Sequence, residues 1–196
     1  VFSLPLGLLV CWGKMSKIPV IRWIVTAYIS IMRGTPLMLQ LMVVYFGPYF
    51  IFGIRISMGY SLIAVFIAFT INYAAYFAEI YRGGIESMPV GQYEAAKILG
   101  YSKAQTFFRI ILPQVFKRIL PSITNEVITL VKDTSLAANI TVTEMFMVTQ
   151  RIVARTYEPL LLYLEVGLIY LIFSTVLTKL QAVGEKKLGS YGQKGV

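Results

Sequence analysis

The stretch Glu94-Ala95-Ala96-Lys97-Ile98-Leu99-Gly100, which runs on to Ile110-Ile111-Leu112-Pro113, is polar although long apolar segments precede and follow it. Its first part predicts a short helix that ends at Gly100, because glycine accepts the left-handed cap conformation at low steric cost. Residues 101–111 predict a second helix with Ser102 as its N-cap, and Pro113 is expected to end it because proline has no N–H. The stretch therefore indicates a helical hairpin that is too short and too polar to cross a membrane.

The composition of the whole chain is that of a membrane protein. Of its 196 residues, 57% are hydrophobic, and the mean hydropathy is +0.72. Soluble domains are nearer 45–50% apolar. Only helices and closed barrels satisfy their backbone groups in lipid, and no alternating ten-residue strands are present. The sequence therefore predicts an all-α integral membrane protein that forms a single domain over residues 1–196.

Several kinds of chemistry are excluded within this chain. It contains no histidine and one cysteine, Cys11, so neither a histidine-bound metal nor an internal disulfide is expected. Gly13-Lys14 is followed by Met15 and lacks the upstream glycine of a phosphate-binding loop. If ATP drives this protein, a partner has to bind it. The net charge of +9 indicates basic cytoplasmic loops rather than nucleic-acid binding.

Five membrane spans are predicted from the apolar runs. The first run, residues 1–12, is shorter than the roughly 20 residues a span needs, so we expect the chain to begin within its first span. Residues 19–32 predict a surface helix that Arg33-Gly34-Thr35-Pro36 breaks. The fourth run is interrupted at residues 132–135 and continues over 136–147, and residues 151–158 predict a polar external loop. The four complete spans are expected at residues 37–51, 61–81, 116–131 and 160–180.

The basic residues predict the orientation of these spans. Most of the 18 Lys and Arg residues, Lys194 near the C-terminus included, fall on the same side as residues 82–115. Only Arg55, Arg151 and Arg155 fall on the other side, and Lys132 lies within the membrane region. Because basic loops stay in the cytoplasm, residues 82–115 and the C-terminus are expected there.

Seven blocks of sequence resemble one family in the same order. The pattern from Glu94 to Pro113 resembles the coupling loop of the membrane-spanning permease subunits of ATP-binding cassette (ABC) importers, and the flanking blocks are similar to the polar amino-acid uptake family, of the histidine, glutamine and arginine type. The resemblance covers about residues 15–187. The flanking blocks include Arg33-Gly34-Thr35-Pro36, Asn72-Tyr73-Ala74-Ala75-Tyr76, Arg82-Gly83-Gly84-Ile85, Gly91-Gln92, Leu112-Pro113-Gln114 and Lys132-Asp133-Thr134-Ser135-Leu136.

The resemblance implies a set of partners. Residues 82–115 would be a cytoplasmic coupling loop that docks on a separate ATPase subunit, which would hold the ATP and Mg²⁺, so this chain itself would need no cofactor. A second permease subunit, identical or related, and an extracytoplasmic amino-acid binding protein would complete the assembly in the bacterial plasma (inner) membrane. The expected coupling residues are Gln92, Glu94, Ala95, Ala96, Gly100 and Pro113.

Glu126 and Asn72 are the candidate substrate residues. Glu126 lies nine residues past Lys117, about 13–14 Å along a helix and so near the middle of a ~30 Å hydrocarbon core. Transporters commonly hold substrate at this depth, and a carboxylate suits an ammonium group. Asn72 lies at a similar depth, and Tyr73 and Tyr76 are expected to line the same pocket. The resemblance places the pocket of basic amino-acid transporters at these matching positions, which favours cationic substrates.

Structural roles remain open for the same residues. Glu126 could pair with Lys132, Asn72 could join two helices, and Lys132-Asp133 could mark a break in the fourth span. Glu79 and Arg82 have the spacing of a helical ion pair. Glu144 and Glu165 are expected near the outer surface, as solvated acids or as contacts of a binding protein.

Two other classes of function are also open. An ion-coupled transporter or channel would use the buried acids without ATP. An intramembrane enzyme would use Glu126 and Asp133 as acid and base, but the absence of histidine and of a nucleophile cluster argues against it. The prediction is a transporter subunit and not an enzyme, with no catalytic and no metal-binding residue.

Overall fold

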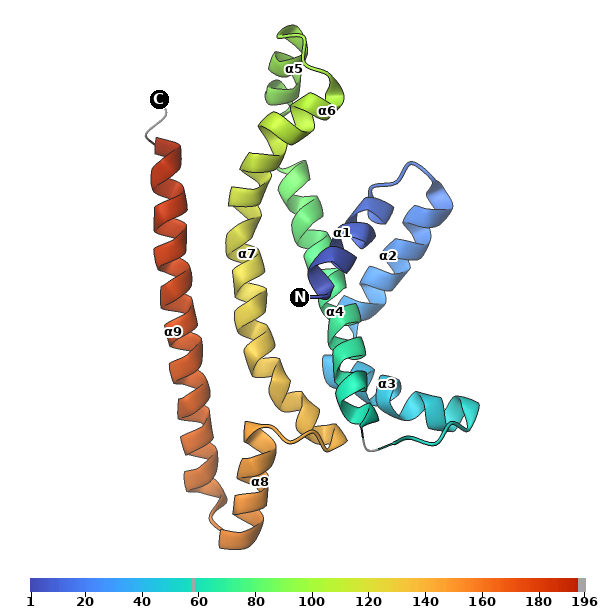
Figure 1. The fold of residues 1–196 in the computed structure, drawn as a ribbon, viewed down its shortest axis with the longest axis vertical. Coiled ribbons are helices and arrows are strands. Elements are labelled where there is room, and N and C mark those ends of the chain that lie inside the picture. Colours follow the sequence, from blue (N-terminus) through green and yellow to red (C-terminus); the bar gives the residue numbers. More distant parts are fainter. Residues whose placement is uncertain (58, 194–196) are drawn as a thin grey trace.

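A computed structural model describes residues 1–57 and 59–193, with side chains up to residue 186, so Lys194 lies outside the described residues. Every element in the described part is helical (Figure 1). The elements are α1 (Ser3–Lys14), α2 (Pro19–Gly34), α3 (Leu37–Phe52), α4 (Tyr60–Glu86), α5 (Val90–Ile98), α6 (Lys103–Gln105), the π-helical η1 (Thr106–Ile111), α7 (Leu112–Asp133), the 3₁₀-helical η2 (Thr134–Ile140), α8 (Met145–Thr156) and α9 (Pro159–Gln193).

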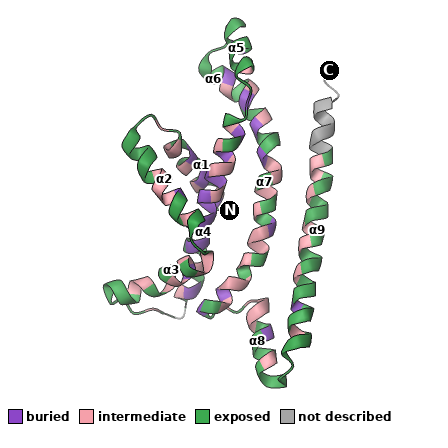
Figure 2. Ribbon diagram, turned by 180° about the vertical axis from the view of Figure 1, so that it is seen from behind, coloured by how far each residue is buried: buried purple, intermediate pink, exposed green. Residues whose placement is uncertain are grey.

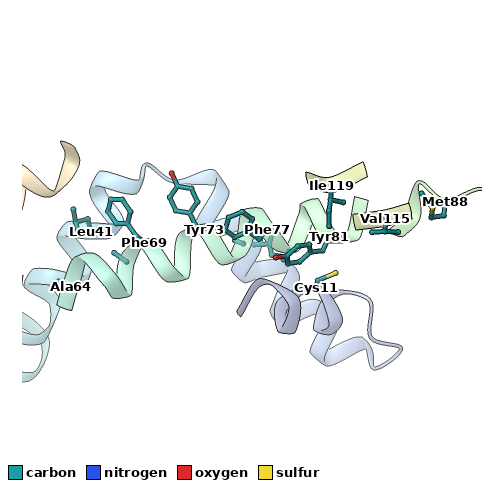
Figure 3. Packing of buried hydrophobic residues seen from close by; sticks show 14 of the residues in the cluster. Cys11, Leu41, Ala64, Phe69, Tyr73, Phe77, Tyr81, Met88, Val115 and Ile119 are labelled. Atoms are coloured by element: carbon teal, nitrogen blue, oxygen red, sulfur yellow. The ribbon is translucent and has the colours of Figure 1, made fainter. Parts of the chain in front are cut away.

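Helix α4 is the centre of the fold, because α1, α2, α3 and α7 all pack against it (Figure 1). Apart from Asn72, its buried residues are small residues and a row of four aromatic residues. Small residues let helices approach closely in lipid. Figure 3 shows Phe69, Tyr73, Phe77 and Tyr81 following one another along the helix, with Cys11 and Ile119 reaching them from α1 and α7. The buried small residues of α4 are Ser61, Ala64, Ala68, Ala74, Ala75, Ala78 and Gly84.

Two helices of the described chain are long and apolar enough to cross a membrane, α4 and the Pro159–Lys186 part of α9. The pair α2 and α3, which is bent by 108°, makes a third if it counts as one span. The other predicted spans fall short for physical reasons: α1 has 12 residues, and α7 carries both basic and acidic side chains along its 22 residues.

The hairpin and the C-terminal end of α9 lie at one end of the molecule, and α3 and α8 lie at the other (Figure 1). Figure 2 shows that buried residues gather along α4 and its neighbours, whereas α9 is exposed along most of its length. Val166 is the buried large hydrophobic residue of α9. The described part of α9 packs only on α7 and α8 among the pairs with substantial contact.

The segment after α7 differs from the prediction. Residues 136–147 do not continue one apolar helix, because η2 ends at Ile140 and its C-cap Thr141 has a left-handed φ of 64°. Residues 151–156 are not a loop but belong to α8. Glu144 explains where α8 begins, since its carboxylate accepts hydrogen bonds from the backbone N–H groups of Phe146 (2.8 Å) and Met147 (2.6 Å). Glu144 is therefore a helix cap rather than a free solvated acid.

The hairpin confirms two predicted features and corrects two. Gly100 has the left-handed φ of 78°, and Ser102 forms a capping box with Gln105. The first helix begins at Val90 rather than Glu94. Pro113 does not end the second helix: α6, η1 and α7 follow one another without a break, and Pro113 lies in the first turn of α7. The π-helical turn before Pro113 lets carbonyl groups reach donors five residues on, which removes the need for a proline N–H.

Candidate functional site

A cavity of about 200 Å³ lies where the turn between α2 and α3 meets α4 and α7. It contains all four predicted substrate residues, three from α4 and one from α7. A larger cavity of about 320 Å³ between α2, α3 and α4 is almost wholly apolar and has no charged side chain. The smaller cavity is lined by Thr35, Leu37, Asn72, Tyr73, Tyr76, Glu126, Thr129 and Asp133.

Asn72 fixes the α2–α3 turn to α4. Its buried side-chain amide donates to the Met32 carbonyl (3.1 Å) and to Gln40 Oε1 (2.9 Å). Gln40 in turn donates to the Met32 carbonyl (2.9 Å) and to Thr35 Oγ1 (2.7 Å). The predicted role of Asn72 as a link between helices is therefore seen directly. Gln40 was not singled out from the sequence, although a lone glutamine in the apolar run 37–46 is a usable signal.

Glu126 lies within electrostatic range of Arg33 but is not in an ion pair with it. It is half-buried in the cavity wall and forms neither an ion pair nor a hydrogen bond with a described residue. The alternative that Glu126 pairs with Lys132 is wrong, since Lys132 is exposed and forms no such ion pair. A carboxylate at membrane depth normally faces a bundle interior or an aqueous cavity.

Asp133 adds a second carboxylate to the same cavity. Its Oδ2 accepts a hydrogen bond of 2.7 Å from the Tyr73 hydroxyl, which ties the end of α7 to α4. The predicted helix break is also present, because α7 ends at Asp133 and the Thr134 and Ser135 hydroxyls bond to backbone carbonyls behind them. The position of Asp133 in the cavity was not predicted from the sequence. The available signal is its spacing of seven residues from Glu126, two turns along one helix face.

Charged residues that pair with one another lie beside Tyr76 at the edge of the cavity. The Arg33 guanidinium lies 5.3 Å from the centre of the Tyr76 ring, a cation–π geometry, and 3.9 Å from the Glu79 carboxylate. Glu79 forms the predicted ion pair with Arg82 at 2.6 Å, and Arg82 also pairs with Glu86. Glu79 is thus a structural acid, whereas Glu165 on α9 is exposed.

The hairpin presents an apolar surface at the end of the molecule. Ala96 is buried, and Gln92 exchanges two hydrogen bonds with Gln114 of α7 (2.9 and 2.7 Å). Glu94, Ala95, Gly100 and Pro113 are exposed. Next to them the large apolar side chains Ile98, Leu99 and Phe108 are 86%, 74% and 65% exposed. Exposed apolar groups in a projecting polar segment are typical of a surface that contacts another protein.

An all-helical membrane protein with an acidic cavity between its helices and a projecting hairpin has the features of a membrane transport subunit. Residues 3–190 match the model of the family described as binding-protein-dependent transport system inner membrane component. The chain belongs to this family.

Named relatives and a solved structure agree with that assignment. The chain is 40% identical to the L-cystine transport system permease protein TcyB of Bacillus subtilis, covering 99% of this chain and 82% of that protein. It is 37% identical to the arginine transport system permease protein ArtQ of the same organism, covering 97% and 85%. A crystal structure of an amino acid ABC transporter with histidines superposes with a TM-score of 0.87 at 33% identity, covering 95% and 85%.

The predicted class is confirmed by these matches. The chain is an ABC permease subunit and not an enzyme, and the ATPase is a separate subunit. The matches do not favour the alternative of an ion-coupled transporter or channel.

We expect Asn72→Leu to lower the stability of the protein, because it leaves Gln40 Oε1 without its buried donor and takes one of two donors from the Met32 carbonyl. The cost is about 1–3 kcal/mol. Thermal unfolding of the purified transporter in detergent measures it. The matched control is Asn125→Leu, an exposed position on α7 that forms no hydrogen bond with a described residue. Equal unfolding temperatures for the two variants would contradict the bracing role of Asn72.

Proposed function

We propose that this permease subunit of an ATP-driven amino-acid importer carries polar amino acids, with a preference for cationic ones, through the cavity of Asn72, Tyr73, Tyr76 and Glu126. The observation that supports the proposal most is the pair of carboxylates in one cavity, of which Glu126 forms no ion pair and no hydrogen bond with a described residue. A carboxylate at membrane depth without an ion pair is costly, and the cationic side chain of a substrate compensates it. The arginine permease among the relatives fits this preference.

In this proposal each residue of the cavity has a different role in substrate binding. Glu126 contacts the cationic side chain of the substrate, which a neutral amino acid lacks. Asp133 stays in place through its hydrogen bond from Tyr73 and adds negative charge on the same wall. Tyr76 offers a ring face that already attracts the Arg33 guanidinium and suits a second cation. Asn72 holds the α2–α3 turn, so its contribution to the substrate is mainly the shape of the cavity.

ATP acts on this chain through the hairpin of residues 82–115. The hairpin and the C-terminus face the cytoplasm, and Ile98, Leu99 and Phe108 enter a groove on the ATPase subunit, which holds the ATP and Mg²⁺. The hairpin is braced to the helices behind it by the Gln92–Gln114 pair and by Arg118, which donates to the Ser87 carbonyl (2.7 Å). A rigid hairpin passes the closure of two ATPase subunits to α4 and α7 and so exposes the cavity to alternate sides.

The remaining partners fit the exposed surfaces. A second permease subunit, identical or closely related, completes the translocation path, and lipid covers the rest of the apolar helices. An extracytoplasmic amino-acid binding protein delivers substrate at the end that holds α3 and α8. Nucleic acid is not a partner, because the basic residues follow the membrane topology rather than one face.

Glu126→Gln is expected to raise the KM for uptake of a cationic amino acid about 10- to 100-fold, the effect of losing one charged hydrogen-bond partner. Neutral amino acids are expected to change much less. The measurement is ATP-dependent uptake by the assembly of permease, ATPase and binding protein in vesicles, with arginine and glutamine in competition. Glu165→Gln, on the exposed face of α9, is the control. An unchanged KM for arginine, or an equal change for both amino acids, would count against the cavity assignment.

Two substitutions of Gly100 distinguish the effect of backbone conformation in the hairpin from the effect of an added side chain. Its φ of 78° suits glycine and is tolerated by asparagine, but a β-branched residue is strained there. Gly100→Val is therefore expected to abolish ATP-dependent uptake and substrate-stimulated ATP hydrolysis, with normal membrane insertion. Gly100→Asn keeps most of both activities. Full uptake by the valine variant would show that the hairpin geometry is not needed for coupling.

A further inference from the structure

A second polar pocket, separate from the substrate cavity, lies where the loop between α1 and α2 approaches the C-terminal end of α4. Its volume is about 350 Å³, and it shares no residue with the cavity around Glu126. Neither the hairpin nor the predicted substrate site uses it. The pocket is lined by Lys14, Met15, Ser16, Arg22, Arg82 and Glu86.

The pocket carries two cations that form no ion pair with a described residue. Arg82 is compensated by Glu79 and Glu86. Lys14 donates to the Thr26 hydroxyl (3.0 Å) and lies within electrostatic range of Glu79, but neither Lys14 nor Arg22 forms an ion pair with a described residue. Ser16 Oγ accepts from the Ile18 N–H (3.2 Å), so its own O–H is available to donate. Two free cations and a hydroxyl donor in one concave site suit a phosphate group.

The surroundings of the pocket are those of a membrane interface. The chain has two tryptophans, and both are close in sequence to the pocket cations: Trp12 is two residues before Lys14, and Trp23 follows Arg22. They are 77% and 73% exposed, and Met15 and Ile18 between the two helices are exposed as well. Tryptophan is enriched at the level of lipid headgroups. A soluble anion would make no use of this exposed apolar border, whereas acyl chains would cover it.

We propose that this pocket binds the phosphate headgroup of an anionic phospholipid, with Lys14 and Arg22 on the phosphate and the acyl chains beside Trp12 and Trp23. Basic pockets between membrane helices bind such headgroups by the same charge complementarity. The bound lipid would fix the α1–α2 loop against the end of α4, next to the Arg82–Glu86 pair. The site is independent of the substrate proposal, because the two cavities have no residue in common.

The test uses the two tryptophans as reporters in the whole transporter. The assembly is placed in phosphatidylcholine vesicles that contain a small share of brominated phosphatidylglycerol or of brominated phosphatidylcholine, and bromine quenching of tryptophan fluorescence is measured. A variant with Trp12→Phe and Trp23→Phe gives the background, which is the tryptophan fluorescence of the other subunits in the assembly. We expect the phosphatidylglycerol to quench more strongly, and Lys14→Gln with Arg22→Gln to reduce this preference about fivefold per charge removed, the effect of one basic residue at an anionic surface.

The control removes two charges elsewhere at the same end of the molecule. Lys179→Gln with Lys186→Gln, both exposed on α9, is expected to keep the full preference. Equal quenching by the two lipids in the wild type, or an equal loss in both double variants, would overturn the proposal. Absence of quenching by either lipid would show that protein covers the pocket, and reversal by inorganic phosphate would show a soluble-anion site. Both of these results also reject the lipid.

Discussion

The close packing of four helices against α4 is the constraint on which the rest of this structure depends. In lipid the hydrophobic effect contributes little to helix association, so the helices are held together by van der Waals packing, which requires their backbones to lie close to one another. Gly84 shows how tight the fit is, because a Cβ at this position would lie 2.2 Å from Ile119 Cγ2 of α7. Gly7 of α1 is similarly close to Phe77. Along this helix the only interruption of apolar packing by an amide is Asn72, and the cavity opens there.

The hairpin and the cavity are joined by the same two helices. α4 enters the hairpin and α7 leaves it, and the two are tied near the hairpin by Arg118 and Ser87. Far from the hairpin they are tied again by Tyr73 and Asp133, inside the cavity. In the proposed mechanism a displacement of the hairpin moves both cavity walls, one carrying Asn72 and the other Glu126.

Local signals in the sequence predicted much of this arrangement. Helical rise alone placed Asn72 and Glu126 at one depth, and the structure brings them to one cavity because both helices start from the hairpin. Ser102 and Gly100 were predictable because caps depend on neighbours in sequence. Asp133 and Gln40 were missed since their partners, Tyr73 and Asn72, are 60 and 32 residues away. The π-helical turn at Pro113 and the cap at Glu144 follow from local backbone geometry that residue patterns do not specify.

The central claim is that force from the ATPase enters this chain at the hairpin and reaches the cavity through α4 and α7. Cysteine cross-linking in a Cys11→Ser background tests it most directly, with Leu99→Cys on the hairpin and Thr156→Cys on α8 at the opposite end, both exposed. A bifunctional reagent is expected to join Leu99→Cys to the ATPase subunit and to stop ATP-dependent uptake, while Thr156→Cys captures no ATPase. The claim is contradicted if Leu99→Cys captures no ATPase subunit, or if Thr156→Cys captures one.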